Sequence, residues 1–141
     1  MSQPPAGFEI IEHTADVAIL GWGPGLPEVF AAMARGLFDV IAGAETVRAV
    51  TERSVTLEAD SHEELLHAWL DELNTLHQIE GELYRDFEVR VDGTRLEATV
   101  RGEALDRLRH DLRTEVKAIT WHELRVDPTA EGYEAYVLLD I

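Results

Sequence analysis

Cysteine is absent from the 141-residue chain, and lysine occurs only once, at Lys117. Without cysteine, the protein forms neither disulfide bonds nor thiolate metal sites, and it has no cysteine nucleophile. No apolar run is long enough to cross a lipid bilayer. The first residues lack the basic and apolar regions of a secretory signal. We therefore expect a cytoplasmic protein that does not insert into membranes.

Positive charge is also scarce. The chain has 12 basic residues against 28 acidic ones, which gives a formal net charge of −16. Such a chain repels phosphate backbones, whereas nucleic-acid-binding proteins usually carry a basic face. We therefore expect no strong direct binding to nucleic acid, so that any role in RNA metabolism passes through a partner protein. The alternative interpretation is that the acidic residues serve solubility alone.

The signature motifs of several enzyme classes are missing. The glycine-rich segment 21–25 (GWGPG) contains proline and matches neither the Walker nor the dinucleotide-binding pattern. His62 and Glu63 begin the zinc-protease motif, but Leu66 stands where its second histidine is needed. There is no Gly-x-Ser-x-Gly sequence. Because no nucleophile, base and oxyanion-binding group come together, we predict that the protein is not an enzyme.

Two amphipathic helices are predicted from the spacing of apolar residues. In the first, apolar side chains recur every three or four residues from Leu26 to Ile41, and the pattern ends near Gly43. The second opens at Ser61, which begins a Ser-x-x-Glu capping box, and it is expected to end near Gly81.

Strands are predicted before, between and after these helices. Residues 51–59 alternate in polarity, as expected for a half-buried strand. Asp92-Gly93 is a strong signal for a two-residue hairpin turn. Segment 103–113 is predicted as a loop or short helix, and Pro128 and Gly132 are placed in the last turn. The other predicted strands span 8–12, 17–22, 83–91, 95–100, 116–126 and 133–141.

This order of elements predicts an α+β fold. We expect one two-layer domain over residues 8–141, in which two main helices pack on a largely antiparallel sheet. Residues 1–7, which include two prolines, are expected to form a disordered or extended N-terminal tail.

Acidic residues from both ends of the chain are the first candidate site. Asp16 follows His13-Thr14-Ala15 between the first two strands, and Asp140 and the terminal carboxylate of Ile141 end the last strand. Carboxylates are hard donors that suit Ca²⁺ or Mg²⁺, and these ions need several of them. If the first and last strands are neighbours, these three residues can form an oxygen-rich cage. Otherwise, Asp16 caps a turn and Asp140 is a solvated charge.

Lys117 is the second candidate, because it stands alone among eleven arginines and the two residue types are not interchangeable. Its compact ammonium group suits a carboxylate cluster or a partner protein; the alternative is evolutionary drift. Histidines are the third candidate class, as bases or metal ligands, although no known ligand spacing links them. His67 and Asp71 are interpreted as a surface pair on the second helix. The other histidines considered are His13, His77, His110 and His122.

Several segments together resemble the archease family, in family order and over nearly the whole chain from Phe8. Two departures are Trp121, where the family often has tyrosine, and segment 17–19, where it often has a glycine-containing sequence. The segments that carry the resemblance are His13-Thr14-Ala15-Asp16, 64–73 (ELLHAWLDEL), 84–89 (YRDFEV), Gly102-Glu103, 115–122 (EVKAITWH) and Asp140-Ile141.

The resemblance implies a non-enzymatic activator of an RtcB-type RNA ligase, which joins cleaved RNA ends in tRNA splicing and RNA repair. That ligase uses GTP and manganese and passes through a guanylylated histidine of its own. The activator is expected to promote guanylylation and multiple turnover. The resemblance also implies a divalent cation, Ca²⁺ in the first place and Mg²⁺ or Mn²⁺ as alternatives, bound by Asp16, Asp140 and Ile141. The candidate partner-contact residues are His13, Asp60, Lys117 and His122.

Two other functions remain as alternatives. The first is a general chaperone or modulator of RNA-modifying enzymes such as a tRNA methyltransferase. The second is a metal-dependent hydrolase that uses His13, Asp16 and Asp140, against which the incomplete catalytic set argues. The first predicts capture of a modifying enzyme, and the second predicts turnover of phosphoester substrates by the purified protein alone.

Overall fold

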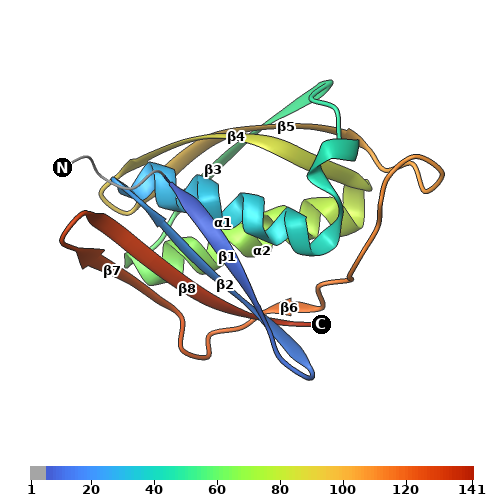
Figure 1. Cartoon of the computed structure of the whole chain (residues 1–141). Coiled ribbons are helices and arrows are strands. Elements are labelled where there is room, and N and C mark those ends of the chain that lie inside the picture. Colours follow the sequence, from blue (N-terminus) through green and yellow to red (C-terminus); the bar gives the residue numbers. More distant parts are fainter. Residues whose placement is uncertain (1–5) are drawn as a thin grey trace.

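The structure, a computed structural model, describes residues 6–141 (Figure 1). Residues 1–5 of the predicted tail lie outside the described residues, and the first strand already includes Gly7. The elements in chain order are β1 (Gly7–Glu12), β2 (Asp16–Gly23), α1 (Leu26–Ile41), the short 3₁₀ helix η1 (Ala44–Thr46), β3 (Thr51–Glu58), α2 (His62–Glu80), β4 (Glu82–Asp92), β5 (Arg95–Ala104), β6 (Ala118–Ile119), β7 (Arg125–Thr129) and β8 (Gly132–Asp140).

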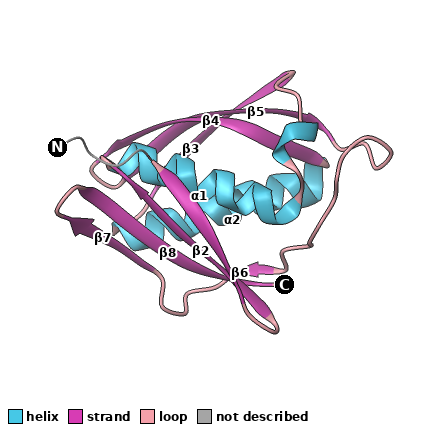
Figure 2. Cartoon of the chain, in the orientation of Figure 1, coloured by secondary structure: helices cyan, strands magenta, loops and turns pink. Residues whose placement is uncertain are grey.

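The strands form two antiparallel sheets. One has the order β1-β2-β8, with β6 and β7 both paired to the second edge of β8. The other has the order β3-β5-β4. The two helices lie between the sheets and contact both of them (Figure 2). The predicted α+β class is confirmed, but the strands are divided between two sheets instead of forming one. No helix within residues 6–141 combines the length and apolar content needed to cross a membrane.

Both predicted ends of α2 are confirmed by their capping bonds. The Ser61 hydroxyl accepts a hydrogen bond from the Glu64 backbone N–H at 3.1 Å, which satisfies one free donor of the first turn. The Glu64 carboxylate accepts in return from the backbone of Asp60, one residue before the usual capping-box position, at 3.2 Å. Gly81 ends the helix at φ 64°, in the left-handed region that favours glycine.

The core lies between the sheets and joins the two helices. Trp69 of α2 is fully buried, and its indole N–H donates to the Phe30 carbonyl of α1 at 2.9 Å. On α1, Phe38 packs edge-on against Tyr84 of β4, with ring centroids 5.4 Å apart. Burying an aromatic or aliphatic side chain of this size contributes about 1.5–3 kcal/mol each. These contacts join the two helices to each other and to β4.

The last third of the chain differs from the prediction. The single strand predicted over 116–126 is wrong: β6 and β7 are separate, with a turn at 120–124 between them. Pro128 lies in β7 and Gly132 in β8, so the last turn lies between these residues and does not contain them. Strand β5 continues to Ala104, and the rest of segment 103–113 has no helix. The hairpin after β4 turns at residues 93–94, one position later than predicted.

Candidate cation and partner-binding site

Strand pairing brings the two ends of the chain together. In the β2–β8 register, Asp16 stands opposite Asp140, and Ala118 of β6 pairs with Asp140 from the other edge. Directly opposed residues of antiparallel strands have Cβ atoms about 4.5–5.5 Å apart on one face of the sheet. In Figure 1 the C-terminus lies beside β6, near the β1–β2 hairpin. The two carboxylates therefore face each other at one end of the larger sheet.

Asp16 is held in an unusual state for a carboxylate. The residue is half-buried, and its Oδ1 atom is buried without any hydrogen-bond partner. Only one other buried side-chain oxygen or nitrogen within residues 6–141 is unpartnered, on Asn74. A buried oxygen without a partner destabilises the fold unless some other group satisfies it. The Asp16 Oδ1 atom is therefore free to accept a hydrogen bond or to coordinate a cation.

A surface pocket of about 460 Å³ is lined by Asp16 and lies between the β1–β2 turn and the turn at 120–124. It contains His13, Asp16 and His122, three residues singled out from the sequence. The backbone N–H of His13 donates to the Asp16 carbonyl at 3.0 Å, which closes the hairpin turn. The full lining is His13, Thr14, Ala15, Asp16, His122, Glu123, Tyr136 and Leu138.

Lys117 lies next to the acidic pair, and Asp60 lies in a different part of the fold. The Lys117 backbone N–H donates to the Asp140 carbonyl at 2.8 Å, and its side chain is exposed. Asp60 is exposed in the turn before α2, where its backbone N–H binds Glu64, and it does not line the pocket. The structure thus brings together all of the predicted site residues except Asp60.

The remaining histidines serve the fold. His77 Nδ1–H donates to the Glu82 carbonyl at 2.9 Å, at the end of α2. His67 does not form the predicted pair with Asp71. Its Nε2 bonds to the Ile119 carbonyl at 2.8 Å, and its ring stacks on Trp121.

His110 belongs to a buried charge network around Glu103, within the Gly102-Glu103 segment that contributed to the family resemblance. Its Nε2 lies 3.0 Å from the Glu103 carboxylate. Burial alone would raise the pKa of Glu103, but hydrogen bonds from His110, Arg109 and the backbone of Arg48 outweigh it and lower the pKa to about 2. Glu103 therefore stays ionised and anchors the loop after β5.

Glu123 and Tyr136 also line the pocket, although neither was predicted from the sequence as a site residue. Glu123 has φ 56°, and it is the only residue besides glycine with positive φ within residues 6–141. This conformation costs an L-residue about 1–2 kcal/mol. The ring of Tyr136 has the Arg125 guanidinium 5.8 Å from its centroid. No sequence pattern marks a left-handed glutamate, whereas the alternation along β8 does place Tyr136 on the outer face.

The metal-binding capacity of the side chains alone is limited. No group of three or more histidine, aspartate or glutamate side chains in the described part of the chain is arranged to hold a metal ion. Asp16 and Asp140 supply two carboxylates. Ile141, the third residue of the predicted set, follows Asp140 directly.

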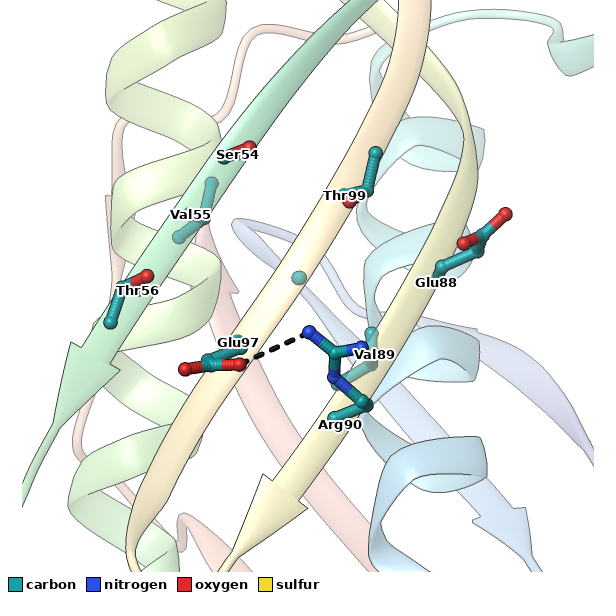
Figure 3. Close-up of a pocket in the computed structure, with 9 residues that line it drawn as sticks. Ser54, Val55, Thr56, Glu88, Val89, Arg90, Glu97 and Thr99 are labelled. Atoms are coloured by element: carbon teal, nitrogen blue, oxygen red, sulfur yellow. Dashed lines mark hydrogen bonds and ion pairs between the residues drawn. The ribbon is translucent and has the colours of Figure 1, made fainter.

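Another pocket, of about 400 Å³, lies on the outer face of the three-stranded sheet (Figure 3). Its polar side chains include Ser54, Thr56 and Thr99, and Arg90 donates to Glu97 across the strands at 3.1 Å. No buried unpartnered group lies among these residues. The pocket has the properties of a solvated sheet face stabilised by cross-strand pairs.

The chain is similar to known proteins in sequence and in fold. Residues 8–141 match the model of the archease protein family (MTH1598/TM1083). The archease of Pyrococcus abyssi is 42% identical over 129 residues, which cover 89% of this chain and 91% of that protein. The solution structure of Methanobacterium thermoautotrophicum protein 1598 has a TM-score of 0.85 and 34% identity, and covers 96% of this chain and 99% of its own. A crystal structure of an archease from Thermotoga maritima shares the fold, with a TM-score of 0.65 and 23% identity over 100% of this chain and 98% of that chain.

Proposed function

The chain belongs to the archease family, and we propose that it activates an RtcB-type RNA ligase through a divalent-cation site at Asp16, Asp140 and Ile141. The observation that carries the proposal is the opposed pair of carboxylates, one of which has a buried oxygen without a partner. The activator promotes guanylylation of the ligase and allows it to turn over repeatedly in tRNA splicing or RNA repair.

The residues present fit a hard divalent cation. Asp16 and Asp140 face each other across two strands, and the Ile141 carboxylate adds oxygen donors at the same end of β8. An all-oxygen set with carboxylates suits Ca²⁺ first, and Mg²⁺ or Mn²⁺ with more bound water. When bound, the ion neutralises the repulsion between the carboxylates and holds the end of β8 against β2.

The activator has no catalytic residue of its own in this account. The pocket formed by the turns at 13–15 and 120–124 contacts the ligase near its nucleotide and metal centre, with His13, His122 and Lys117 as contact residues. Tighter binding to the guanylylation-competent conformation shifts the ligase population towards it. The net charge of −16 accelerates encounter with a basic ligase surface, so activation weakens as salt rises.

The direct test measures transfer of labelled GMP from GTP to the cognate ligase with and without the protein. We expect faster formation of the ligase–GMP adduct with the wild-type chain and loss of the effect with Asp16→Ala. Asp92→Ala removes an exposed carboxylate outside the pocket and serves as the control. Equal rates with and without the wild-type chain would exclude activation at this step, and full activity of Asp16→Ala would exclude the site.

A second candidate function is a chaperone or modulator of RNA-modifying enzymes, such as a tRNA methyltransferase. The observation in its favour is that the Thermotoga maritima archease is described as a possible chaperone. This function predicts that the protein protects a modifying enzyme from aggregation and leaves ligase guanylylation unchanged. The hydrolase alternative has little support, because His13, Asp16 and Asp140 do not form a three-ligand group in the described residues.

A further inference from the structure

Trp121 is a large exposed aromatic residue that is held rigidly. Its side chain is 58% exposed, whereas Trp69 is fully buried and Trp22 is half-buried. One face of its indole stacks on the His67 imidazole, with ring centroids 3.7 Å apart and planes 6° from parallel. A single exposed apolar residue is ordinary on a protein surface. An exposed indole that is already held in one orientation is less common. Such a side chain loses little conformational entropy when it binds a partner.

The stack is fixed from the helix side. His67 Nε2 bonds to the Ile119 carbonyl of β6 at 2.8 Å, which ties α2 to the residues just before Trp121. On the other side of Trp121, the His122 backbone N–H donates to the Thr120 hydroxyl at 3.3 Å, and the Leu124 N–H donates to the Trp121 carbonyl at 3.3 Å. The turn at 120–124 is therefore closed on itself and fastened to α2.

This same turn serves two surfaces. Its residues His122 and Glu123 line the pocket that contains Asp16, while Trp121 stacks on His67 of α2. A partner that covers the pocket therefore also meets the turn that carries Trp121.

The acidic character of the protein indicates the kind of partner. Asp71 lies one helical turn after His67 on the same face of α2 and is exposed, and Glu123 lies two residues after Trp121. An exposed aromatic face on a chain of net charge −16 suits a guanidinium group, whose positive charge is attracted to the chain and whose plane stacks on the ring. A nucleobase also stacks on aromatic rings, but the carboxylates and the net charge of −16 repel its phosphates.

We propose that Trp121, supported by His67, is the docking anchor of this protein for an arginine side chain on the partner protein's surface. The inference rests on the proposed function, because the partner it names is the RtcB-type ligase. Anchoring residues at the centre of protein interfaces are commonly tryptophan and arginine, and they pair with each other across the interface. The anchor supplies affinity, and the acidic pocket supplies activation.

The test measures the dissociation constant for the cognate ligase by calorimetry, for full-length variants at fixed salt and cation concentration. Trp121→Ala should weaken binding about tenfold or more, and Trp121→Phe, which keeps a ring over His67, should stay within about threefold. Ile79→Ala is the matched control, because Ile79 is 75% exposed on the far end of α2. Thermal melting checks that all three variants remain folded at the assay temperature.

Fluorescence gives an independent readout. Since Trp121 is the one strongly exposed tryptophan within residues 6–141, ligase binding should shift its emission to shorter wavelength in the wild type and not in Trp121→Ala. Wild-type affinity of Trp121→Ala alongside normal activation by the wild type would overturn the anchor and leave the proposed function intact. Absence of any wild-type binding to the ligase would overturn the proposed function and the anchor with it. Binding of cleaved RNA alone that requires Trp121 would replace the protein anchor with a nucleic-acid contact.

Discussion

Replacing Asp16 with asparagine should change stability in opposite directions with and without a divalent cation. Asp16 faces Asp140 across β2 and β8, and its buried Oδ1 has no hydrogen-bond partner. Like charges directly opposite on neighbouring strands destabilise a sheet by about 0.2–1 kcal/mol. The amide of Asp16→Asn removes this repulsion and offers the Asp140 carboxylate a hydrogen-bond donor.

The magnitudes follow from these contacts. In EDTA the free energy of unfolding of the variant should exceed that of wild type by about 0.5–1 kcal/mol. Its Tm should then be about 2–4 °C higher, for a domain of this size. A cation at about 100 times its Kd stabilises the wild type by about 2.7 kcal/mol, or roughly 8–10 °C. The variant has lost one of the carboxylates, so it should gain much less. The order of the two melting temperatures therefore reverses when the cation is added.

The assay is differential scanning calorimetry of both proteins in EDTA and in Ca²⁺, Mg²⁺ or Mn²⁺. Asp92→Asn is the control, since it makes the same change in net charge at an exposed residue outside the pocket. The difference in Tm between Asp92→Asn and the wild type should be the same in every buffer. A wild-type Tm that no cation raises, together with an Asp16→Asn variant less stable than wild type in EDTA, would refute the cation-site reasoning.

Three further predictions concern the fold around the site. Gly102→Ala should destabilise the protein by about 3 kcal/mol or more in urea unfolding. The added Cβ would overlap the Leu83 carbonyl and lie 2.7 Å from the Tyr84 Cα. Near-wild-type stability would contradict this packing. Glu123→Gly should stabilise by about 1 kcal/mol by relieving the left-handed backbone, and an unchanged or lower Tm would show that no strain is stored there. Glu103 contributes stability that is complete above its unfolded pKa of 4.5 and is lost as the pH falls towards its folded pKa of about 2. The stability difference between wild type and Glu103→Gln should therefore shrink over that range, and a constant difference would contradict the ion-pair network.

The helices were predictable because their signals are local. Ser61 and Gly81 mark the two ends of α2 through side-chain capping and left-handed backbone, which depend on residue type alone. The spacing of apolar residues likewise gave the extent of α1. The division of strands between two sheets was not predictable, because alternation reports that a face is buried and not which strand lies beside it.

The turn at 120–124 shows where the sequence signal ends. Residues 116–126 have strand-like composition, and glutamate at position 123 gives no sign of a left-handed backbone, for which glycine or asparagine is usual. A single strand was therefore predicted across this turn, which contributes His122 and Glu123 to the pocket. The stack of Trp121 on His67 went unseen for the same reason, since it depends on where that turn lies against α2.

The prediction of the acidic pair depended on one assumption about the strand topology. Residue chemistry suggested that Asp16, Asp140 and Ile141 could gather only if the first and last strands were neighbours, and β2 does pair with β8. The position of Asp60 was not available from the sequence, because it depends on how the turn before α2 sits against the sheets. Whether the acidic pair holds a cation remains a prediction that the melting experiment tests.

The most direct test of the central claim counts ligation events. The protein is mixed in substoichiometric amount with its cognate RtcB-type ligase, GTP, Mn²⁺ and excess cleaved RNA, and joined RNA is measured per ligase molecule. We predict many turnovers with the wild-type chain, and about one without it or with Asp16→Ala. The same number of turnovers in all three mixtures would contradict ligase activation and favour the modulator of RNA-modifying enzymes.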